Sequence, residues 1–172
     1  DIDTPKGIRD RAILETVYSA GLRCEELVGM TVSCLNLKEG KARIMGKGQR
    51  ERMVPLGTEA VRRLDDYLRK VRKTCAWAAS GDSLWIAMNG LPLGYPGVQA
   101  LPDRYREAPG ITTRICLHGI RRACATHMLR RGASAVSIQL LLGHADMSHL
   151  KSYLDVAMTD LKKAHEESRL GQ

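Results

Sequence analysis

The sequence predicts a mainly α fold with a small three-stranded antiparallel β-sheet, an α+β architecture. Apolar residues recur three or four positions apart over several long stretches, which is the spacing of amphipathic helices. Three short β-prone runs follow one another between turn residues in the first third of the chain. With 172 residues, of which 44% are hydrophobic, the chain is long enough to bury the core of one domain.

The N-terminal part is predicted to form two helices and then the sheet. Thr4 and Pro5 are typical of a helix start, and the first helix should end at Gly21. A short helix is expected over residues 23–28. The β-prone runs are residues 32–37, 42–45 and 52–56. They predict a meander that carries Lys47 in its second turn.

The remainder is predicted to be helical on both sides of an irregular segment. Apolar residues at helical spacing, with Arg and Lys on the other face, predict a long helix over residues 58–79. Residues 80–110 are rich in Gly and Pro, which predicts a linker or mobile region with one helix near residues 98–106. Further helices are expected at residues 118–131, residues 134–142 with Ser134 as the cap, and around Tyr153 and Leu161.

The charge balance favours a polyanionic partner. The chain has 27 Lys and Arg against 19 Asp and Glu, so its net charge is 27 − 19 = +8. Basic side chains that neutralise phosphates release counterions and give sequence-independent affinity for nucleic acid. Many basic domains bind no nucleic acid, so charge alone leaves a plain basic domain as the alternative.

The patterns of cysteine and apolar residues indicate in which cellular compartment the protein is expected. The five cysteines form no CxxC pair, so we expect no disulfide framework and no metal site, and interpret them as core residues in a reducing cytoplasm. No apolar run reaches eighteen residues, which argues against a membrane span. The protein is expected to be cytoplasmic. Residues 1–172 are expected to form a single domain, and because the chain opens at Asp1 without a Met, it is expected to be a fragment that lacks an N-terminal domain.

Polar residues in several places suit one reaction. His118 and Arg121, three apart on one helix, project from the same face and suit one phosphate group. A two-metal nuclease is not favoured, because the sequence has no evident cluster of carboxylates. The candidate catalytic residues are Arg23, Lys47, His118, Arg121, His144 and Tyr153.

Five boxes carry a resemblance to the tyrosine recombinase (phage integrase) family. They are GLRCEEL at residues 21–27, GKG at 46–48 followed by RMVPL at 52–56, HGIR at 118–121 running on to RGA at 131–133, LGH at 142–144, and Tyr153. An isolated HxxR is a weak signal, but these boxes keep the family's order over almost the whole chain. The resemblance implies the fold of the family's catalytic domain.

The resemblance also implies a reaction, in which Tyr153 attacks a DNA phosphate. The products are a covalent 3′-phosphotyrosyl bond and a free 5′ hydroxyl, so strands are rejoined without ATP, a metal ion or a cofactor. A phenol with a pKa of about 10 is a poor nucleophile at neutral pH, so the site must supply a base and positive charge. Arg23 and Arg121 are expected to clamp the non-bridging oxygens.

Other residues have implied supporting roles. Lys47 resembles the general acid that protonates the departing 5′ oxygen, and His144 resembles a donor to a phosphate oxygen. His118 is expected to help deprotonate Tyr153 or to order the site. Glu26, three residues after Arg23, is expected to orient that guanidinium.

The implied partner is double-stranded DNA, and the resemblance implies that the N-terminal domain expected to be missing is a DNA-binding domain. Arg122, Arg130 and Arg131 are expected to contact its backbone. The family assembles as a tetramer on two duplexes by exchanging a C-terminal segment, for which residues 158–172 are the candidate. The isolated chain is expected to be monomeric. The target site, and whether Tyr153 acts on its own subunit's phosphate, stay open.

Two other functions stay open as well. Residues 119–120, Arg122 and Cys124 depart from the family pattern around the reacting groups, so a non-catalytic DNA-binding relative is one alternative. A topoisomerase-like enzyme that relaxes supercoils by the same chemistry is another. Taken alone, Tyr153 is also compatible with an ordinary helix residue and Lys47 with a solvated turn.

Overall fold

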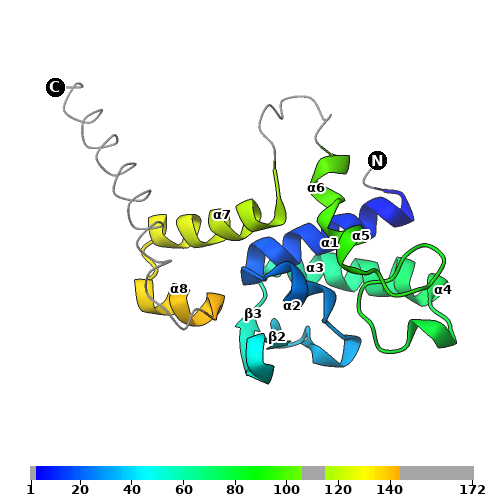
Figure 1. The fold of residues 1–172 in the computed structure, drawn as a ribbon, viewed down its shortest axis with the longest axis horizontal. Coiled ribbons are helices and arrows are strands. Elements are labelled where there is room, and N and C mark those ends of the chain that lie inside the picture. Colours follow the sequence, from blue (N-terminus) through cyan, green and yellow to red (C-terminus); the bar gives the residue numbers. More distant parts are fainter. Residues whose placement is uncertain (1–2, 106–114, 144–172) are drawn as a thin grey trace.

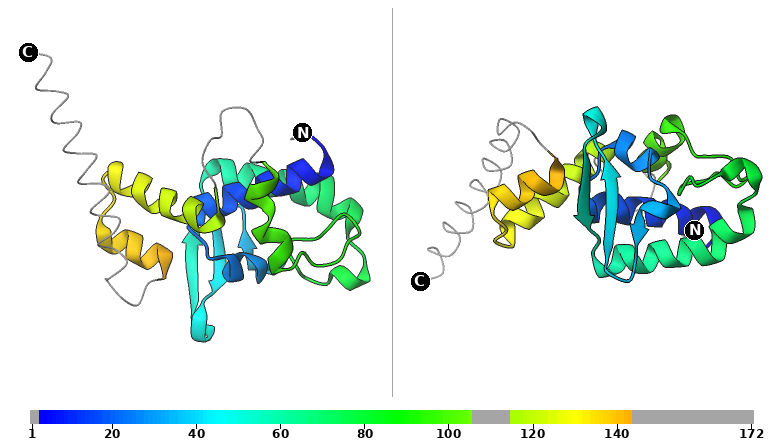
Figure 2. Two further views of the ribbon diagram at one scale, coloured as in Figure 1. Left: turned by 45° about the horizontal axis from the view of Figure 1, so that its top comes forward. Right: turned by 90° about the horizontal axis from the view of Figure 1, so that it is seen from below.

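A computed structural model of the chain describes residues 3–105 and 115–143. These residues form helices beside a three-stranded antiparallel sheet, which confirms the predicted fold class (Figure 1). Two further views place α7 and α8 together at one end of the molecule and α4 at the other (Figure 2). The α-helices and strands are α1 (Pro5–Ala20), α2 (Cys24–Val28), β1 (Leu35–Asn36), β2 (Lys41–Met45), β3 (Glu51–Pro55), α3 (Thr58–Tyr67), α4 (Lys73–Cys75), α5 (Tyr95–Gln99), α6 (Leu101–Arg104), α7 (Leu117–Arg130) and α8 (Ala135–Leu142).

Helix α1 lies in the middle of the fold and packs against both α3 and α7. It begins at Pro5, and the Thr4 hydroxyl accepts a hydrogen bond from the Gly7 N–H at 3.1 Å. It ends where Gly21 takes a left-handed conformation, with φ of 59°. Both predicted ends are confirmed.

The sheet is a meander in the order β1-β2-β3. Buried and exposed residues alternate along β2 and β3, which places Ile44 and Val54 in the core. Arg52 pairs with Ile44 and therefore points to the same inner face. The first strand is shorter than predicted, because Val32–Cys34 form a 3₁₀ turn. Lys47–Gln49, another short 3₁₀ turn, join β2 to β3, as the sequence predicted for Lys47.

The predicted long helix is present, but it is shorter and changes its winding. After α3, residues Leu68–Arg72 form a π-helical turn, and α4 then ends the helix at Cys75 rather than at residue 79. Leu64, Tyr67 and Val71, three or four positions apart, are fully buried on its inner face.

The expectation of a linker or mobile region at residues 80–110 is wrong for the part that the structure describes. Trp85 is buried and stacks on Tyr67, with ring centroids 5.4 Å apart. The Tyr67 hydroxyl donates to the Leu84 carbonyl at 2.9 Å and accepts from the Ile86 N–H at 3.1 Å. The Gly and Pro content reflects irregular backbone, which here packs against the core through apolar side chains such as Leu84 and Trp85. Two short helices, α5 and α6, stand where one was expected.

Helices α7 and α8 form a hairpin with its own small core of Ala125, Ile138 and Leu142. Helix α7 ends before Gly132, with φ of 84°, and the Ser134 hydroxyl caps α8. Helix α8 ends at Gly143, with φ of 62°. The predicted boundaries are confirmed to within a residue or two.

Cysteine burial corrects one expectation. Cys124 is buried but Cys116 is exposed, and the other three are half-buried, so the interpretation of all five as core residues is wrong. Within the part of the chain that the structure describes, every helix is too short or too polar to cross a bilayer.

Candidate active site

Arg23 enters the site from the start of α2. It occupies the N-cap position, where its backbone N–H donates to Oε2 of Glu26 at 2.9 Å. Its guanidinium Nη1 donates to Oε1 of the same carboxylate at 3.2 Å and to the Leu142 carbonyl at 3.3 Å. The side chain stays 41% exposed, so it can reach a ligand. The predicted orientation of Arg23 by Glu26 is present.

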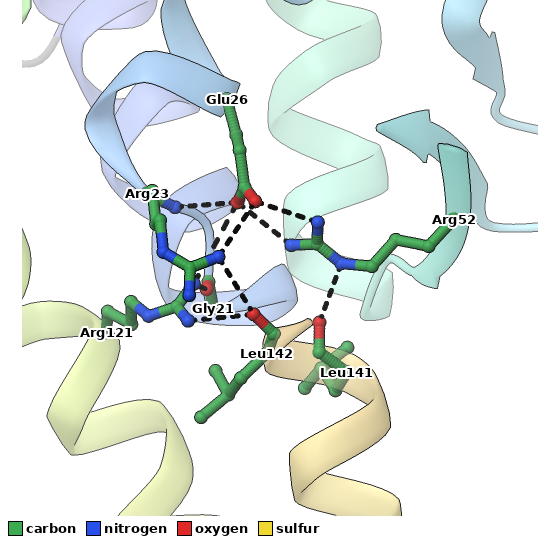
Figure 3. Close-up of polar contacts among 7 residues, drawn as sticks. All are labelled: Gly21, Arg23, Glu26, Arg52, Arg121, Leu141 and Leu142. Carbon is green, nitrogen blue, oxygen red and sulfur yellow. Dashed lines mark hydrogen bonds and ion pairs between the residues drawn. The ribbon is translucent and has the colours of Figure 1, made fainter. Parts of the chain in front are cut away.

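Arg121 reaches the same place from α7, although 98 residues separate it from Arg23 in sequence. Its side chain is 3% exposed, and its guanidinium donates to the Gly21 carbonyl and, at 2.8 Å, to the Leu142 carbonyl. Nη1 lies 3.8 Å from Oε2 of Glu26. The two predicted arginines therefore share an acceptor and a counter-ion (Figure 3).

A third arginine, Arg52 on β3, completes the cluster. It forms a two-pronged ion pair with Glu26, with Nη1 to Oε1 at 2.8 Å and Nη2 to Oε2 at 2.9 Å. Its Nε donates to the Leu141 carbonyl at 3.1 Å. We call Arg23, Arg52, Arg121 and Glu26 the arginine cluster. The cluster holds three positive groups and one negative group, so it carries an excess of two positive charges.

Glu26 stays ionised at the centre of the cluster. Burial on its own would raise the pKa of this carboxyl, since its side chain is 4% exposed. Hydrogen bonds from Arg52 and from the Arg23 backbone, together with the charges of Arg52 and Arg121, outweigh burial and lower the pKa below its usual value. The carboxylate therefore remains a permanent anchor for the guanidinium groups near neutral pH.

Two pockets meet at Arg23. The first, of about 400 Å³, is lined by Arg23, His118 and Arg121, with Cys24 and Cys116 beside them. His118 is exposed on the first turn of α7 and shares this pocket with Arg121, as the HxxR spacing predicted. The second, of about 850 Å³, is a groove between the β2–β3 hairpin and α8. Its walls include Arg23, Gly46 and Gly143.

The other predicted site residues fall in four groups. The backbone of Lys47 follows Gly46 at the rim of the groove, whereas His144 and Tyr153 lie outside the described residues. Arg122 is exposed on α7 beside Arg121. The predicted DNA contacts Arg130 and Arg131 are exposed, but they lie at the far end of α7, about 14 Å along its axis.

Arg52 is the site residue that the sequence analysis missed. Its box was noted, but no role was assigned to it. One signal was available: in the alternation of β3, Val54 faces inward and Arg52, two positions earlier, occupies the same inner face. A charged residue at an inward position requires a buried partner.

The fold and the paired arginines together define the class of protein. This is the architecture of a tyrosine recombinase catalytic domain. The crystal structure of XerA recombinase superposes with a TM-score of 0.82 at 26% identity, covering 93% of this chain and 59% of that chain. XerH site-specific recombinase, in a post-cleavage complex with palindromic difH substrate, gives a TM-score of 0.80 at 20% identity over 96% of this chain and 47% of that chain, a likeness of fold.

The chain belongs to the phage integrase family, whose match covers residues 1–160. It is 41% identical over 172 residues to the tyrosine recombinase XerD of Xanthomonas axonopodis pv. citri (strain 306). That alignment covers 96% of this chain and 56% of the relative, so the chain spans little more than half of the relative's length. The resemblance inferred from the boxes is confirmed.

Proposed function

We propose that this chain is the catalytic part of a site-specific DNA recombinase, which cleaves and rejoins strands through a covalent 3′-phosphotyrosyl bond. The observation that carries the proposal is the convergence of Arg23 and Arg121. The two guanidinium groups come from separate helices and meet at one carbonyl, that of Leu142, and one carboxylate, that of Glu26. Planar guanidinium forks suit the non-bridging oxygens of a phosphodiester, and their charge offsets the charge that develops during attack.

In the proposed reaction the Tyr153 oxygen attacks phosphorus, and the bond from phosphorus to the 5′ oxygen breaks. Lys47 gives a proton to the departing 5′ oxygen, and His118 assists removal of the tyrosine proton. His144 donates to a phosphate oxygen. The phosphotyrosyl bond keeps the energy of the broken bond, so attack by a 5′ hydroxyl reverses the step without ATP, a metal ion or a cofactor.

Double-stranded DNA is the proposed partner, with Arg122, Arg130 and Arg131 as contacts to its backbone. The net charge of +8 supports this partner. The relative XerH is described in complex with its difH substrate. We further propose that residues 1–172 act as a single domain, which assembles as a tetramer on DNA through residues 158–172.

Covalent capture of DNA tests the proposal. The chain is incubated with nicked duplexes of randomised sequence, whose short cleaved end diffuses away and traps the intermediate, and the captured duplexes are sequenced. Attachment should resist denaturant, persist in EDTA and disappear in Tyr153→Phe, which should still bind DNA. Attachment in Tyr153→Phe, or dependence on a metal ion, would refute the assignment.

The same preparation separates the alternatives. A non-catalytic DNA-binding relative would retain duplexes without a covalent bond. A topoisomerase-like enzyme would relax supercoiled DNA of any sequence, whereas a recombinase should capture a defined site and exchange strands between two copies of it.

A further inference from the structure

Arg52 joins three separate parts of the fold at the arginine cluster. Its side chain is 16% exposed and reaches from β3 to Glu26 on α2 and to the Leu141 carbonyl at the end of α8. Each of its three guanidinium nitrogens has a hydrogen-bond partner at 2.8 to 3.1 Å. A planar fork with a partner on each nitrogen has one orientation, so the strand, the α2 carboxylate and the helix end are held in a fixed relation.

Two glycines pack directly against this guanidinium. A Cβ atom added to Gly143 would lie 3.0 Å from the central carbon of the Arg52 guanidinium, and one added to Gly46 would lie 3.4 Å from its Nη1. Gly46 directly precedes Lys47, and Gly143 directly precedes His144. Arg52 therefore lies between the backbone segments that lead into two of the predicted catalytic residues.

We propose that Arg52 is a positioning residue, which holds the Lys47 turn and the end of α8 in register with Arg23 and Arg121. The inference rests on the proposed function, since it needs Lys47 to act as a general acid. Arg52 uses its guanidinium on Glu26 and on the Leu141 carbonyl, and no reacting role is assigned to it. It acts on Lys47 through the backbone at Gly46 and packs in the same way against Gly143 at the end of α8, whereas Glu26 keeps Arg23 and Arg121 as partners of its own.

A positioning role differs from a purely stabilising one in what it controls. Buried ion pairs contribute little net stability compared with apolar residues of the same size, because desolvation offsets their attraction. They do fix geometry. A displacement of about 1 Å at a reacting group can cost on the order of 10²-fold in rate. Loss of Arg52 should therefore slow proton donation by Lys47 far more than it weakens DNA binding.

The leaving group provides the test. A duplex with a sequence found in the capture experiment is synthesised again, with sulfur in place of the bridging 5′ oxygen at the phosphate that is cleaved. A thiol has a pKa of about 8.5 and leaves as a thiolate, so it needs no general acid. Arg52→Gln should attach the ordinary duplex about 10²-fold more slowly than the parent chain. It should recover most of that loss on the sulfur duplex, as Lys47→Ala should.

Three variants make the comparison specific. Arg43→Gln removes the same charge from an exposed position on β2, where Arg43 pairs with Glu51 at 3.9 Å, and should attach both duplexes at the parent rate. Arg52→Lys keeps the charge but cannot form the fork, and should show the same pattern as Arg52→Gln to a smaller degree. Tyr153→Phe should attach neither duplex.

Hydrogen exchange of two amides gives a readout without DNA. The Gly46 N–H donates to the Arg50 carbonyl at 2.8 Å, and the Gly143 N–H donates to the Leu140 carbonyl at 3.2 Å. Both amides should exchange faster in Arg52→Gln than in Arg43→Gln. Equal exchange in the two variants would overturn the inference.

The outcomes separate the inference from the function on which it depends. If the parent chain captures no duplex, the proposed function fails and the inference fails with it. If the parent chain and Lys47→Ala behave as expected, but Arg52→Gln matches the parent rate or is not rescued by sulfur, the inference alone is overturned.

Discussion

Glu26 carries one negative charge among three guanidinium groups. It accepts from Arg23 and Arg52 and lies 3.8 Å from Arg121, with 4% of its side chain exposed. Removing one partner of a buried ion pair leaves an uncompensated charge, which is more costly than the pair is stabilising. The stability of the arginine cluster therefore depends strongly on this one carboxylate.

Replacing Glu26 by Gln should lower the free energy of unfolding by about 3 kcal/mol near neutral pH, because Arg52 and Arg121 lose their counter-ion. Urea unfolding measures the change. Glu25→Gln, at an exposed neighbouring position, is the control and should stay within about 0.5 kcal/mol of the parent. Equal losses in the two variants would contradict the central role of Glu26.

The pH dependence of stability should depend on the same carboxyl. Because folding lowers the pKa of Glu26, its stabilising contribution is complete above the unfolded value of 4.5 and is lost as the pH falls through the lower folded value. The stability difference between the parent and Glu26→Gln should therefore be constant from neutral pH to about pH 5 and should shrink below it. Unfolding curves across this range check the sign, and a difference that grows in acid would be inconsistent with it.

Gly143 combines a left-handed backbone with close packing against Arg52. Gly143→Ala should cost about 1 kcal/mol for the positive φ, as at other helix ends, and more because its Cβ would press on the Arg52 guanidinium. Gly132→Ala is the matched control, since Gly132 also has a positive φ, of 84°, but faces open space. Thermal unfolding should rank Gly143→Ala as the more destabilised variant, and equal values would argue against the packing with Arg52.

At the scale of elements, the irregular segment after α4 is held by side chains of the α3 helix. Tyr67 is buried, stacks on Trp85, and uses its hydroxyl both as donor and as acceptor to the backbone of this segment. The segment then leads into α5, which packs against α2, the helix that carries Glu26. A region without regular structure thus supports one wall of the site.

Removing the Tyr67 hydroxyl should destabilise the protein. Tyr67→Phe leaves the Leu84 carbonyl and the Ile86 N–H buried without this partner, at a cost of about 1 to 3 kcal/mol. Denaturant unfolding followed by tryptophan fluorescence reports the change, because Trp85 lies against this ring. Tyr95→Phe, with a side chain 43% exposed, should change stability by less than about 0.5 kcal/mol. A neutral Tyr67→Phe would show that the Tyr67 hydroxyl does not help to hold the segment.

At the scale of the whole molecule, the arginine cluster lies where three parts of the fold meet. These are the α1–α2 corner, the β2–β3 hairpin and the α7–α8 hairpin, which occupies one end of the molecule (Figures 1 and 2). The proposed DNA contacts Arg122, Arg130 and Arg131 extend along or just beyond α7 at that end.

Changing Arg122, Arg130 and Arg131 together to Gln should weaken the salt dependence of DNA binding. Each phosphate contact that is lost should reduce the slope of log affinity against log salt by about one unit. A control with Arg62, Arg69 and Lys70 changed to Gln removes the same charge from the α3–α4 helix, where each side chain has an acidic partner on the same helix. The slope of the control should stay close to that of the parent. Equal slopes for the two variants would contradict the proposal that Arg122, Arg130 and Arg131 contact DNA.

The sequence by itself determined the local features of this protein. Thr4, Gly21, Ser134 and Gly143 mark helix ends because capping and left-handed turns depend on a few neighbouring residues. Short alternating runs determined the sheet for the same reason. The order of the boxes determined the family, and the three-residue spacing of Arg23 and Glu26 predicted their pairing.

Tertiary structure alone decided which hydrogen-bond and ion-pair partners are shared by residues from distant segments. The family resemblance predicted that Arg23 and Arg121 act together, but the acceptor and counter-ion that they share, and the use of Glu26 by Arg52, depend on how α2, β3 and α7 pack, and no local pattern encodes that packing. The burial of Trp85 in a glycine- and proline-rich segment depends likewise on Tyr67 across the core. The physical reason is that hydrophobic burial and buried charge pairing act between surfaces brought together by the whole chain, whereas turns and caps act within a few residues of it.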